Sequence, residues 1–315
     1  MKYDRLQVFT GNSNPALAEE ICECLGCRLG ASSMKTFSDG EIYLQIQENV
    51  RGVDCFVVQS TCTPVDRNIM ELLLMIDALK RASADRITAV LPYYGYARQD
   101  RKDKPRVPIS ARLVADILQA AGANRLLCLD LHAAQIQGFF TIPVDELTAL
   151  TLLSDYIKSK KLKDMVVVAT DIGITKHARD LATKLNTPLV IIEKRRIGNN
   201  DSAEMLNIIG DVAGMTAILI DDEIDTAGSL VTAVEALTKA GSNAVYSLCT
   251  HPVFSGPAIE RISKCPVKEV VVTDTIPVPT MKRNGKITVI SIAELLGEAI
   301  RRIHAGESIG AMFQD

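Results

Sequence analysis

The 315-residue sequence contains no long hydrophobic run. Its densest apolar stretches, such as 72–76 and 165–169, are far shorter than the roughly 18 residues that a membrane-spanning helix needs. The first residues, Met-Lys-Tyr-Asp-Arg, also lack the hydrophobic segment of a secretory signal. We therefore expect a cytoplasmic protein that does not act at a membrane.

Cysteine is scarce as well. Eight cysteines in 315 residues are too few for a disulfide-built scaffold, and in the cytoplasm they should be reduced thiols. The cluster Cys22, Cys24 and Cys27 has no second ligand pair and no nearby histidine, whereas a structural zinc ion takes four ligands. We interpret these residues as small apolar side chains.

The sequence has no excess of positive charge. It has 35 Lys and Arg residues against 38 Asp and Glu, a net charge of −3, which argues against a nucleic-acid-binding protein. It also lacks the two common phosphate-binding loops, Gly-x-x-x-x-Gly-Lys-Ser/Thr and Gly-x-Gly-x-x-Gly. Any nucleotide must therefore be bound in another way.

Short β-branched runs alternate with helix-length segments along the whole chain. We expect strands at 6–9, 55–59, 87–91, 126–130, 166–170, 189–192, 217–221 and 245–250 and near 270 and 287, with helices from 15, at 65–81, 109–121, 147–159, 175–185 and 229–240, and from 292. Near-continuous apolar strands that alternate with helices are typical of parallel sheets covered on both faces. The sequence therefore predicts an α/β fold with mainly parallel sheets flanked by helices.

Two segments of the chain resemble each other. In both 121–132 and 240–251, Ala-Gly-x-Asn ends a predicted helix, an apolar run follows, and a histidine comes last. A match of helix, cap, strand and histidine in one register indicates an internal repeat. We expect two similar domains, 1–146 and 147–303, with the C-terminal segment 304–315 packed back on the first.

The clearest candidate site is the segment 217–229. Four apolar residues there lead to Asp221 and Asp222, and a helix follows the small-residue loop 226–229. Free N–H groups at a helix start bind anions, and acidic groups at a strand end bind sugar hydroxyls. A short match of this kind often marks only an Asp-rich helix cap. Because strand, paired acids and loop all occur in order, we interpret the segment as a cradle for a phosphate beside a sugar.

Two further polar residues follow predicted strands. His132 comes just after the strand that ends at Asp130, and Asp171 follows 166–170. Two strand ends that face one crevice can hold a hydrated Mg²⁺ ion, which keeps its waters and needs few protein ligands. A lone histidine is more often structural, but its context, Asp-Leu-His-Ala-Ala-Gln, favours a site. We expect Mg²⁺ as the cofactor, with His132 and Asp171 as its ligands.

The segments 37–41, 93–101, 130–140 and 193–196 together resemble the ribose-phosphate diphosphokinase family, and 217–229 resembles the phosphoribosyl-diphosphate motif of type I phosphoribosyltransferases. The resemblance runs from about residue 6 to residue 313. It implies two domains of type I phosphoribosyltransferase fold. It also implies transfer of the diphosphoryl group of MgATP to the anomeric hydroxyl of ribose 5-phosphate, giving 5-phosphoribosyl 1-diphosphate and AMP.

The resemblance also implies roles for individual residues. They are Phe37, Asp39, Gly40, Glu41, Arg98 and Gln99 for ATP; Arg196, Asp221, Asp222, Asp225, Thr226, Ala227, Gly228 and Ser229 for ribose 5-phosphate; and Lys194 and Arg196 for catalysis. In the family the Phe37 segment comes from a neighbouring subunit. We therefore expect a homo-oligomer with shared active sites, a hexamer built from dimers.

Phosphate and ADP are the effectors that the resemblance implies. They would bind at a subunit junction through Arg51, Ser83, Gln135 and Ser308. The chain departs from the family at two places. Gly310 stands where a second serine is common, and Ile174 stands in the diphosphate loop 171–177 where a glycine is usual. We expect weaker effector binding from the first difference and an altered diphosphate loop from the second.

Two other functions stay open. A phosphoribosyltransferase would share the 221–229 loop but would not explain 37–41 or Arg98 and Gln99. A catalytically silent regulatory subunit would keep the fold, although the presence of Lys194 and Arg196 argues against it.

Overall fold

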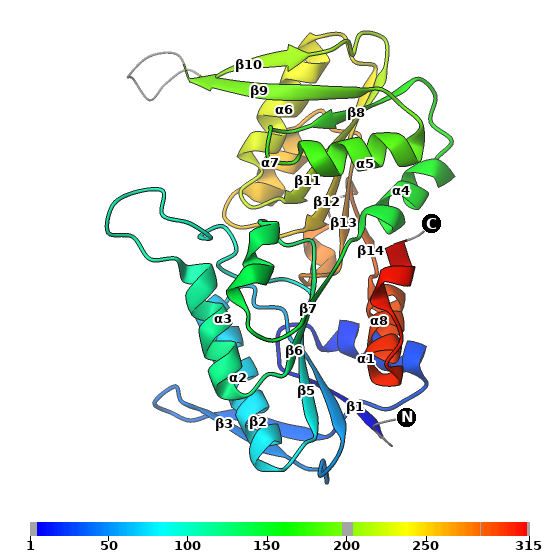
Figure 1. The fold of residues 1–315 in the computed structure, drawn as a ribbon. Helices are drawn as coiled ribbons and strands as arrows, with labels where there is room; N and C mark the ends of the chain where they lie inside the picture. The colour runs from blue at the N-terminus through cyan, green and yellow to red at the C-terminus, as the bar shows by residue number, and fades with distance from the viewer. Residues whose placement is uncertain (1–4, 197–203, 284, 314–315) are drawn as a thin grey trace. The chain divides into compact units, whose positions relative to one another are not determined.

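The computed structural model describes residues 5–196, 204–283 and 285–313 and divides into two compact units (Figure 1). Unit 1 comprises Met1–Leu147, Thr275–Pro277 and Ser291–Asp315, and unit 2 comprises Thr148–Asp274 and Val278–Ile290. This division differs from the sequence-based one, which places 291–303 in the second domain. The reason is that helix α8 (Ala293–Ala305) packs on α1 (Pro15–Leu25) of unit 1.

Unit 1 is built on a parallel sheet. Strands β1 (Leu6–Thr10), β4 (Asp54–Val58), β5 (Arg86–Leu91), β6 (Arg125–Leu129) and β7 (Val144–Leu147) pair in that order. Figure 1 shows helices α2 (Val65–Arg81) and α3 (Ser110–Ala121) on one face and α1 and α8 on the other. Because successive side chains of a strand face opposite sides, β4 is buried along its whole length.

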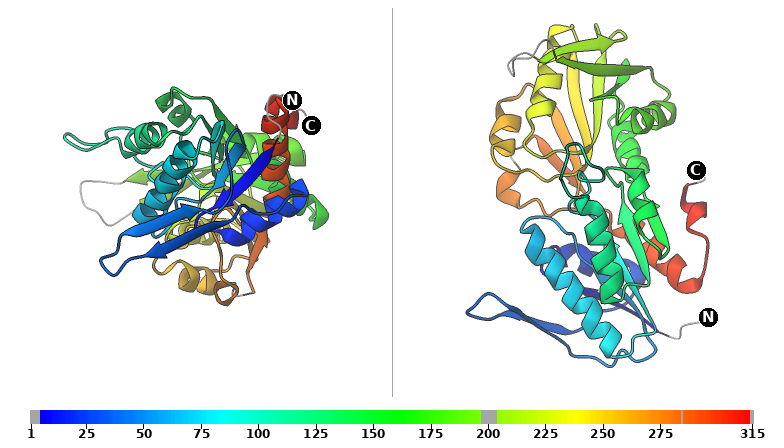
Figure 2. Two further views of the ribbon diagram at one scale, coloured as in Figure 1. Left: turned by 90° about the horizontal axis from the view of Figure 1, so that it is seen from below. Right: turned by 60° about the vertical axis from the view of Figure 1, so that its left-hand side comes forward.

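A two-stranded hairpin forms a second, separate sheet in unit 1. Strands β2 (Ser32–Thr36) and β3 (Ile42–Ile46) pair antiparallel and pack against α2 through Met34, Leu44 and Ile46. The tip, residues 37–41, projects beyond the helices and the sheet of unit 1 (Figure 2).

Unit 2 has a larger sheet. Its strands pair in the order β10-β9-β8-β11-β12-β13-β14, and all of them are parallel except β10. Their bounds are β8 (Met165–Ala169), β9 (Leu189–Arg196), β10 (Glu204–Ile209), β11 (Thr216–Glu223), β12 (Ala244–His251), β13 (Glu269–Thr273) and β14 (Ile287–Ile290). Helices α4 (Leu150–Ser159) and α5 (Thr175–Leu185) cover one face, and α6 (Gly228–Lys239) and α7 (Ala258–Lys264) cover the other. The α/β prediction is confirmed in both units.

The two units share one topology. A parallel bridge between Val8 and Leu29 extends the sheet of unit 1 beyond β1. With this bridge included, β1 corresponds to β8, β4 to β11, β5 to β12 and β6 to β13. The internal repeat is therefore real, but the sequence match between 121–132 and 240–251 is out of register, because it pairs β6 with β12. A glycine-capped helix before a strand occurs several times in such a fold, so this local match does not identify the equivalent strand.

A buried ion pair fastens the C-terminal helix to unit 1. The Asp54 carboxylate, at the start of β4, accepts hydrogen bonds from Arg86 Nε (2.8 Å) and Nη2 (2.5 Å). His304 Nδ1 lies 2.9 Å from the same carboxylate, and Arg86 also donates to the Ile303 carbonyl at 3.0 Å.

Short 3-10 turns complete the structure: η1 (Ala134–Phe139), η2 (Thr280–Lys282) and η3 (Ile309–Phe313). None of the helices in the described ranges is long and apolar enough to cross a membrane.

Candidate active site

The acidic end of β11 lies next to the start of α5. β11 extends to Glu223, so Asp221 and Asp222 belong to the strand itself. Asp221 Oδ2 accepts a hydrogen bond from Thr170 Oγ1 at 3.0 Å, which links the ends of β8 and β11. Burial raises the pKa of Asp221 well above its usual range, and the charge of Asp222 raises it further, while the Thr170 bond acts in the opposite direction. The Asp221 carboxyl is held in place by this bond and by the Asp222 N–H, which donates to its Oδ1 at 3.0 Å.

The loop between β11 and α6 is hydrogen-bonded to Ser255, which precedes α7, and to Arg261 of α7. Asp225 Oδ1 accepts a hydrogen bond from the Ser255 hydroxyl, and the Ser255 N–H donates to the Asp225 carbonyl at 3.0 Å. Arg261 Nη1 donates to the Thr226 carbonyl at 3.0 Å. Nothing in the sequence marked Ser255 or Arg261 as part of the site, because their link to this loop exists only in the folded chain.

The same loop opens α6. Ala227 has a left-handed conformation, with φ 59°, and the helix begins at Gly228. Thr226 and Ser229 are exposed at this end. The first N–H groups of a helix have no partner within the helix, and the dipole adds partial positive charge. The loop has the chemistry of an anion site next to the two carboxyls of β11.

The β8–α5 loop is ordered by Asp171. Its Oδ1 accepts a hydrogen bond from the Ile174 N–H at 3.1 Å, and a Cβ added at Gly173 would lie 3.1 Å from the same oxygen. Ile174 is 7% exposed and has φ −85°, a conformation that any residue adopts. The position does not need a glycine, so the departure from the family pattern causes no backbone strain here.

Lys194 and Arg196 lie in the last residues of β9. In the antiparallel pairing with β10, Lys194 is opposite Leu206 and Arg196 is opposite Glu204. The polar segment that follows them, 197–203, lies outside the described residues. The structure therefore places the backbone of both residues in the part of β9 that pairs with the edge strand β10.

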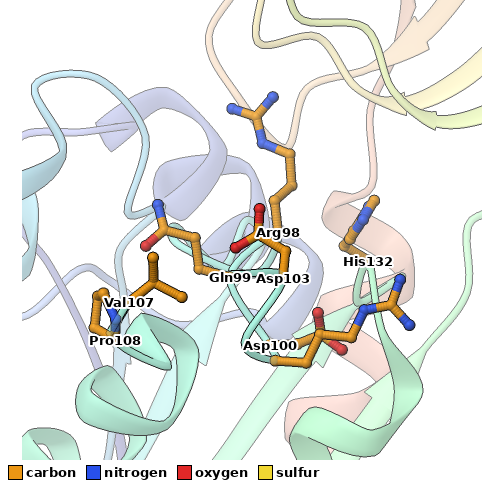
Figure 3. Close-up of a pocket in the computed structure, with 8 residues that line it drawn as sticks. Arg98, Gln99, Asp100, Asp103, Val107, Pro108 and His132 are labelled. Carbon is orange, nitrogen blue, oxygen red and sulfur yellow. The ribbon is translucent and has the colours of Figure 1, made fainter. Parts of the chain in front are cut away.

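Unit 1 carries a pocket of about 430 Å³ at the carboxyl ends of β5 and β6. It is lined by Arg98, Gln99, Asp100, Arg101, Asp103, Val107, Pro108 and His132. Figure 3 shows Arg98 and His132 on two different loops of this pocket. The predicted ATP residues Arg98 and Gln99 and the predicted metal ligand His132 are thus brought together, although they are far apart in the sequence.

The loop that carries Arg98 and Gln99 is fixed by contacts on both sides. Gly95 N donates to Thr61 Oγ1 at 2.6 Å, and a Cβ at Gly95 would lie 2.4 Å from the Thr61 carbonyl, so only glycine fits. At the other end, Gln99 Oε1 accepts from the Ser110 hydroxyl and the Gln99 carbonyl accepts from the Ala111 N–H at 3.2 Å. Gln99 is therefore anchored to the first turn of α3.

The hairpin tip presents aromatic rings to solvent. Phe37 and Tyr43 are 53% and 42% exposed, and their rings meet edge to face with centroids 5.9 Å apart. The turn depends on Gly40, which has φ 95°, and on Asp39 Oδ1, which accepts from the Glu41 N–H at 3.0 Å. Two exposed rings on a projecting tip are typical of a binding surface.

The two predicted metal ligands belong to different units, His132 to unit 1 and Asp171 to unit 2, and both are exposed. Within the described part of the chain, no group of three or more His, Cys, Asp and Glu residues is arranged to hold a metal ion.

The predicted effector residues lie at opposite ends of the unit 1 sheet. Arg51 and Ser83 occupy adjacent turns at the amino ends of β4 and β5, where the Gly52 N–H donates to the Ser83 carbonyl at 3.0 Å. Ser308 follows α8, whose last turn contacts the start of β4. Gln135 lies beyond the carboxyl end of β6 and donates to Asp100. A strand of five or six residues, roughly 15–20 Å, separates the two ends, so Gln135 can join the others only from a second chain.

Comparisons with known proteins agree with this arrangement over almost the whole chain. Residues 6–122 match the family model of the N-terminal domain of ribose phosphate pyrophosphokinase, and residues 197–314 match that of the phosphoribosyl synthetase-associated domain. The ribose-phosphate pyrophosphokinase of Caldanaerobacter subterraneus is 59% identical, and the match covers 98% of both chains. That of Bacillus subtilis is 51% identical over 98% of this chain and 97% of its own.

A solved structure extends the likeness to three dimensions. The phosphoribosylpyrophosphate synthetase of Mycobacterium smegmatis superimposes with a TM-score of 0.91 at 45% identity, covering 96% of this chain and all of the other. The acid-rich β11, the start of α6 and the unit 1 pocket thus lie in a chain that matches these enzymes over 96–98% of its length. This protein belongs to the ribose-phosphate pyrophosphokinase family.

Proposed function

We infer that this protein transfers the diphosphoryl group of ATP to the 1-hydroxyl of ribose 5-phosphate, giving 5-phospho-α-D-ribose 1-diphosphate and AMP. The observation that carries the inference is the β11–α6 loop, where two carboxyls and a helix start lie together, in a chain that matches ribose-phosphate pyrophosphokinases over 98% of its length. The cytoplasmic location expected from the sequence is part of the same proposal.

The ribose 5-phosphate site that we propose is this loop. The phosphate binds the N–H groups and hydroxyls of Thr226 to Ser229, with Ala227 and Gly228 keeping the backbone open to it. Asp221 and Asp222 hydrogen-bond the ribose hydroxyls, and Asp225, held by Ser255, lies at the rim. The hydrogen bonds from Ser255 and Arg261 already fix the loop, which lowers the entropic cost of ordering it around a ligand.

ATP binds in the pocket of unit 1 in this proposal. Arg98 and Gln99 contact the nucleotide and its phosphates, while the tip of a hairpin from a neighbouring subunit supplies the Phe37 ring, Asp39 and Glu41 to the adenosine. Support for a shared site comes from the hairpin itself, whose tip projects from unit 1 with both rings exposed. The homo-oligomer, a hexamer built from dimers, is part of the same proposal.

Mg²⁺ is the metal ion that we propose, with His132 and Asp171 as its protein ligands. The Asp171 carboxylate offers the oxygen donor that Mg²⁺ prefers, and this ion commonly binds one or two protein groups plus substrate phosphates and water. When bound, the ion would neutralise charge on the ATP phosphates.

The reaction is an in-line displacement at the β-phosphorus. A bond forms between the sugar O1 and the β-phosphorus. The bond from the β-phosphorus to the oxygen that bridges it to the α-phosphorus breaks, and this oxygen leaves with AMP. The proton of the 1-hydroxyl is released. Such a transfer depends on alignment and on neutralising the charge of the transferred group. We assign the second task to Lys194 and Arg196, which follow each other closely at the end of β9.

One assay tests this function against its two alternatives. Purified protein incubated with MgATP and ribose 5-phosphate should form AMP and 5-phosphoribosyl 1-diphosphate in equal amounts. A silent regulatory subunit would form neither product. A phosphoribosyltransferase would consume 5-phosphoribosyl 1-diphosphate with a base and would leave ATP intact.

A shared site predicts complementation between variants. Phe37→Ala and Arg98→Ala should each raise the ATP concentration needed for half-maximal rate, because each removes one side of the nucleotide site. Mixed oligomers should recover part of the lost activity, since some sites combine an intact tip with an intact pocket. Activity is measured after subunit exchange has been verified with differently tagged chains. No recovery in the mixture would show that one chain supplies both residues.

The effector site predicts a gain from Gly310→Ser. A Cβ at Gly310 would lie 3.4 Å from Ser308 Oγ, so the new hydroxyl would sit beside an existing one. One added hydrogen bond to an anion contributes about 1.5–3 kcal/mol, so half-maximal phosphate activation and ADP inhibition should shift to concentrations lower by about ten-fold or more. Titrations of both substrates without effector should be unchanged. Identical effector titrations for the two proteins would remove Gly310 from the site.

A further inference from the structure

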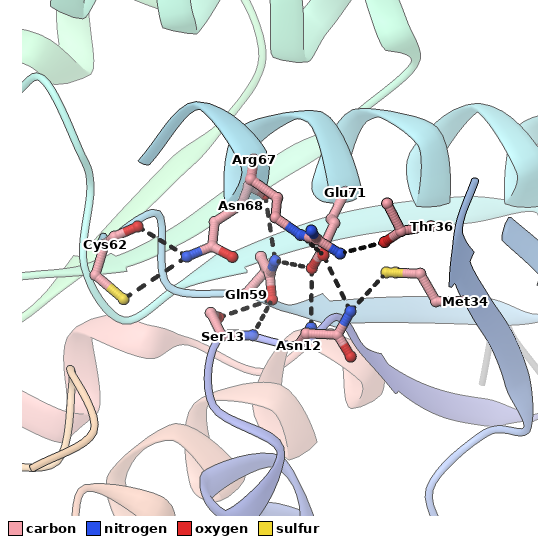
Figure 4. A network of polar contacts seen from close by, with 9 residues as sticks. All are labelled: Asn12, Ser13, Met34, Thr36, Gln59, Cys62, Arg67, Asn68 and Glu71. Atoms are coloured by element: carbon pink, nitrogen blue, oxygen red, sulfur yellow. Dashed lines mark hydrogen bonds and ion pairs between the residues drawn. The ribbon is translucent and has the colours of Figure 1, made fainter. Parts of the chain in front are cut away.

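A network of polar side chains lies beneath the start of α2, outside the residues assigned above (Figure 4). Its centre is the Glu71 carboxylate, which is completely buried. Asn12 donates to it through its backbone N–H and its side-chain Nδ2, both at 3.0 Å, and Gln59 Nε2 donates at 3.1 Å. Arg67 Nε donates to Glu71 Oε1 at 3.1 Å.

The network holds Glu71 in its charged form. Burial by itself would raise the pKa of this carboxyl, but the hydrogen bonds from Asn12, Arg67 and Gln59 outweigh burial and lower it. Gln59 is fixed in turn, because its Oε1 accepts from the Ser13 hydroxyl at 2.7 Å and its Nε2 donates to the Asn68 carbonyl at 3.2 Å. Glu71 is therefore a rigid, ionised anchor on α2.

Arg67 connects this anchor to the hairpin. While its Nε is bound to Glu71, its Nη2 donates to Thr36 Oγ1 at 2.7 Å, and Thr36 is the last residue of β2 before Phe37. A second link lies two residues earlier in β2, where Asn12 Nδ2 meets Met34 Sδ at 2.9 Å. The planar guanidinium donates from two separate nitrogens in one fixed geometry, whereas an ammonium group must reach both acceptors from a single nitrogen.

We propose that Arg67 is a positioning residue for ATP binding, which holds the base of the β2–β3 hairpin so that Phe37 is presented in one orientation. This inference rests on the proposed function, because it uses the assignment of the hairpin tip to the ATP site. Among the described residues, the tip is held by its own turn bonds and by the contact of Phe37 with Tyr43 of the same hairpin. A bond at its base therefore limits the orientations of the whole tip.

The test is the ATP dependence of the Arg67→Met variant. Methionine keeps the length of the stem and the helix propensity but makes neither bond. We expect the KM for ATP to rise about three- to ten-fold, because the variant loses one or two partly exposed hydrogen bonds. The kcat and the KM for ribose 5-phosphate should be nearly unchanged. The matched control is Arg81→Ala, which removes an ion pair to Asp77 on the same helix without touching the hairpin. Both are measured at one fixed phosphate concentration.

Two further variants separate positioning from general stability. Thr36→Val removes only the acceptor on the hairpin and should raise the KM for ATP, and combining it with Arg67→Met should add little, because both remove the same bond. Arg67→Lys keeps the charge but has a single nitrogen in place of the Nε and Nη2 that bind Glu71 and Thr36, so we expect it to behave like Arg67→Met. Fully additive effects, or an Arg67→Lys variant with the wild-type KM, would overturn the proposal.

Hydrogen exchange provides a readout that does not depend on activity. The Phe37 N–H donates to the Glu41 carbonyl at 2.8 Å and the Gly40 N–H to the Phe37 carbonyl at 2.9 Å, so both amides report on order in the tip. They should exchange faster in Arg67→Met than in wild type or Arg81→Ala. Unchanged exchange together with an unchanged KM for ATP would refute the inference while leaving the proposed function intact. A wild-type protein that forms no AMP would instead refute the proposed function, and exchange would still measure the effect of Arg67.

Discussion

Replacing Lys194 by alanine should lower kcat by about 10³-fold while leaving the affinity for ribose 5-phosphate almost unchanged. The reason is that the proposed role of Lys194 is to neutralise charge that develops on the transferred group, and interactions made only in the transition state act on kcat. Single-turnover rates and ribose 5-phosphate titrations of the purified variant measure the two quantities separately.

Lys239→Ala is the matched control for this prediction. Lys239 is an exposed lysine in the last turn of α6, at the opposite end of that helix from the phosphate loop. Its removal takes the same charge from unit 2 and should leave both kcat and binding unchanged. If Lys194→Ala loses binding and turnover to the same extent, Lys194 holds the substrate in its ground state and the catalytic assignment is wrong.

The second large effect is expected from Ser229→Asp. Ser229 is exposed in the first turn of α6, where we place the phosphate of ribose 5-phosphate. Two unit charges about 4 Å apart near a protein surface repel each other by about 4 kcal/mol. The affinity for ribose 5-phosphate should therefore fall by at least about 100-fold, since 1.4 kcal/mol corresponds to ten-fold. Calorimetric titration measures this directly.

The same substitution should not destabilise the protein. A carboxylate in the first turn of a helix is favourable by about 0.3–1 kcal/mol, so the Tm should stay the same or rise. Ser229→Asn, of similar size but neutral, is the control and should lose much less affinity. Normal ribose 5-phosphate binding by Ser229→Asp would mean that the phosphate does not occupy the start of α6.

The long elements could be predicted from the sequence, but several short ones could not. The helix expected at 65–81 matches α2, and the strands near 55, 87, 166, 217 and 245 are present. The hairpin β2–β3, strands β7 and β10 and helix α7 were missed. β7 reads Val-Asp-Glu-Leu and lies at the edge of its sheet, and α7 has seven residues, so neither shows a hydrophobic period long enough to detect.

The site divides in the same way. The order of apolar strand, paired acids and small-residue loop at 217–229 marks an anion site in the sequence, because those residues are consecutive. Ser255 and Arg261, which hold that loop, and Thr170, which bonds Asp221, carry no such pattern. The roles of Ile174 and Gly40 also needed φ angles, which showed that the first requires no glycine and the second does.

The sequence by itself determined the class of fold and the family and predicted the loop that we propose for the phosphate, since alternating apolar segments and consecutive motifs are local properties of a chain. Only the tertiary structure decided which strands are equivalent in the two units and that α8 belongs with the first. It alone joined Glu71, Arg67 and Thr36 into one network, and it alone placed Arg51 and Gln135 at opposite ends of a sheet. The physical reason is that these relations depend on strand order and long-range contacts, which arise only when distant segments pack together.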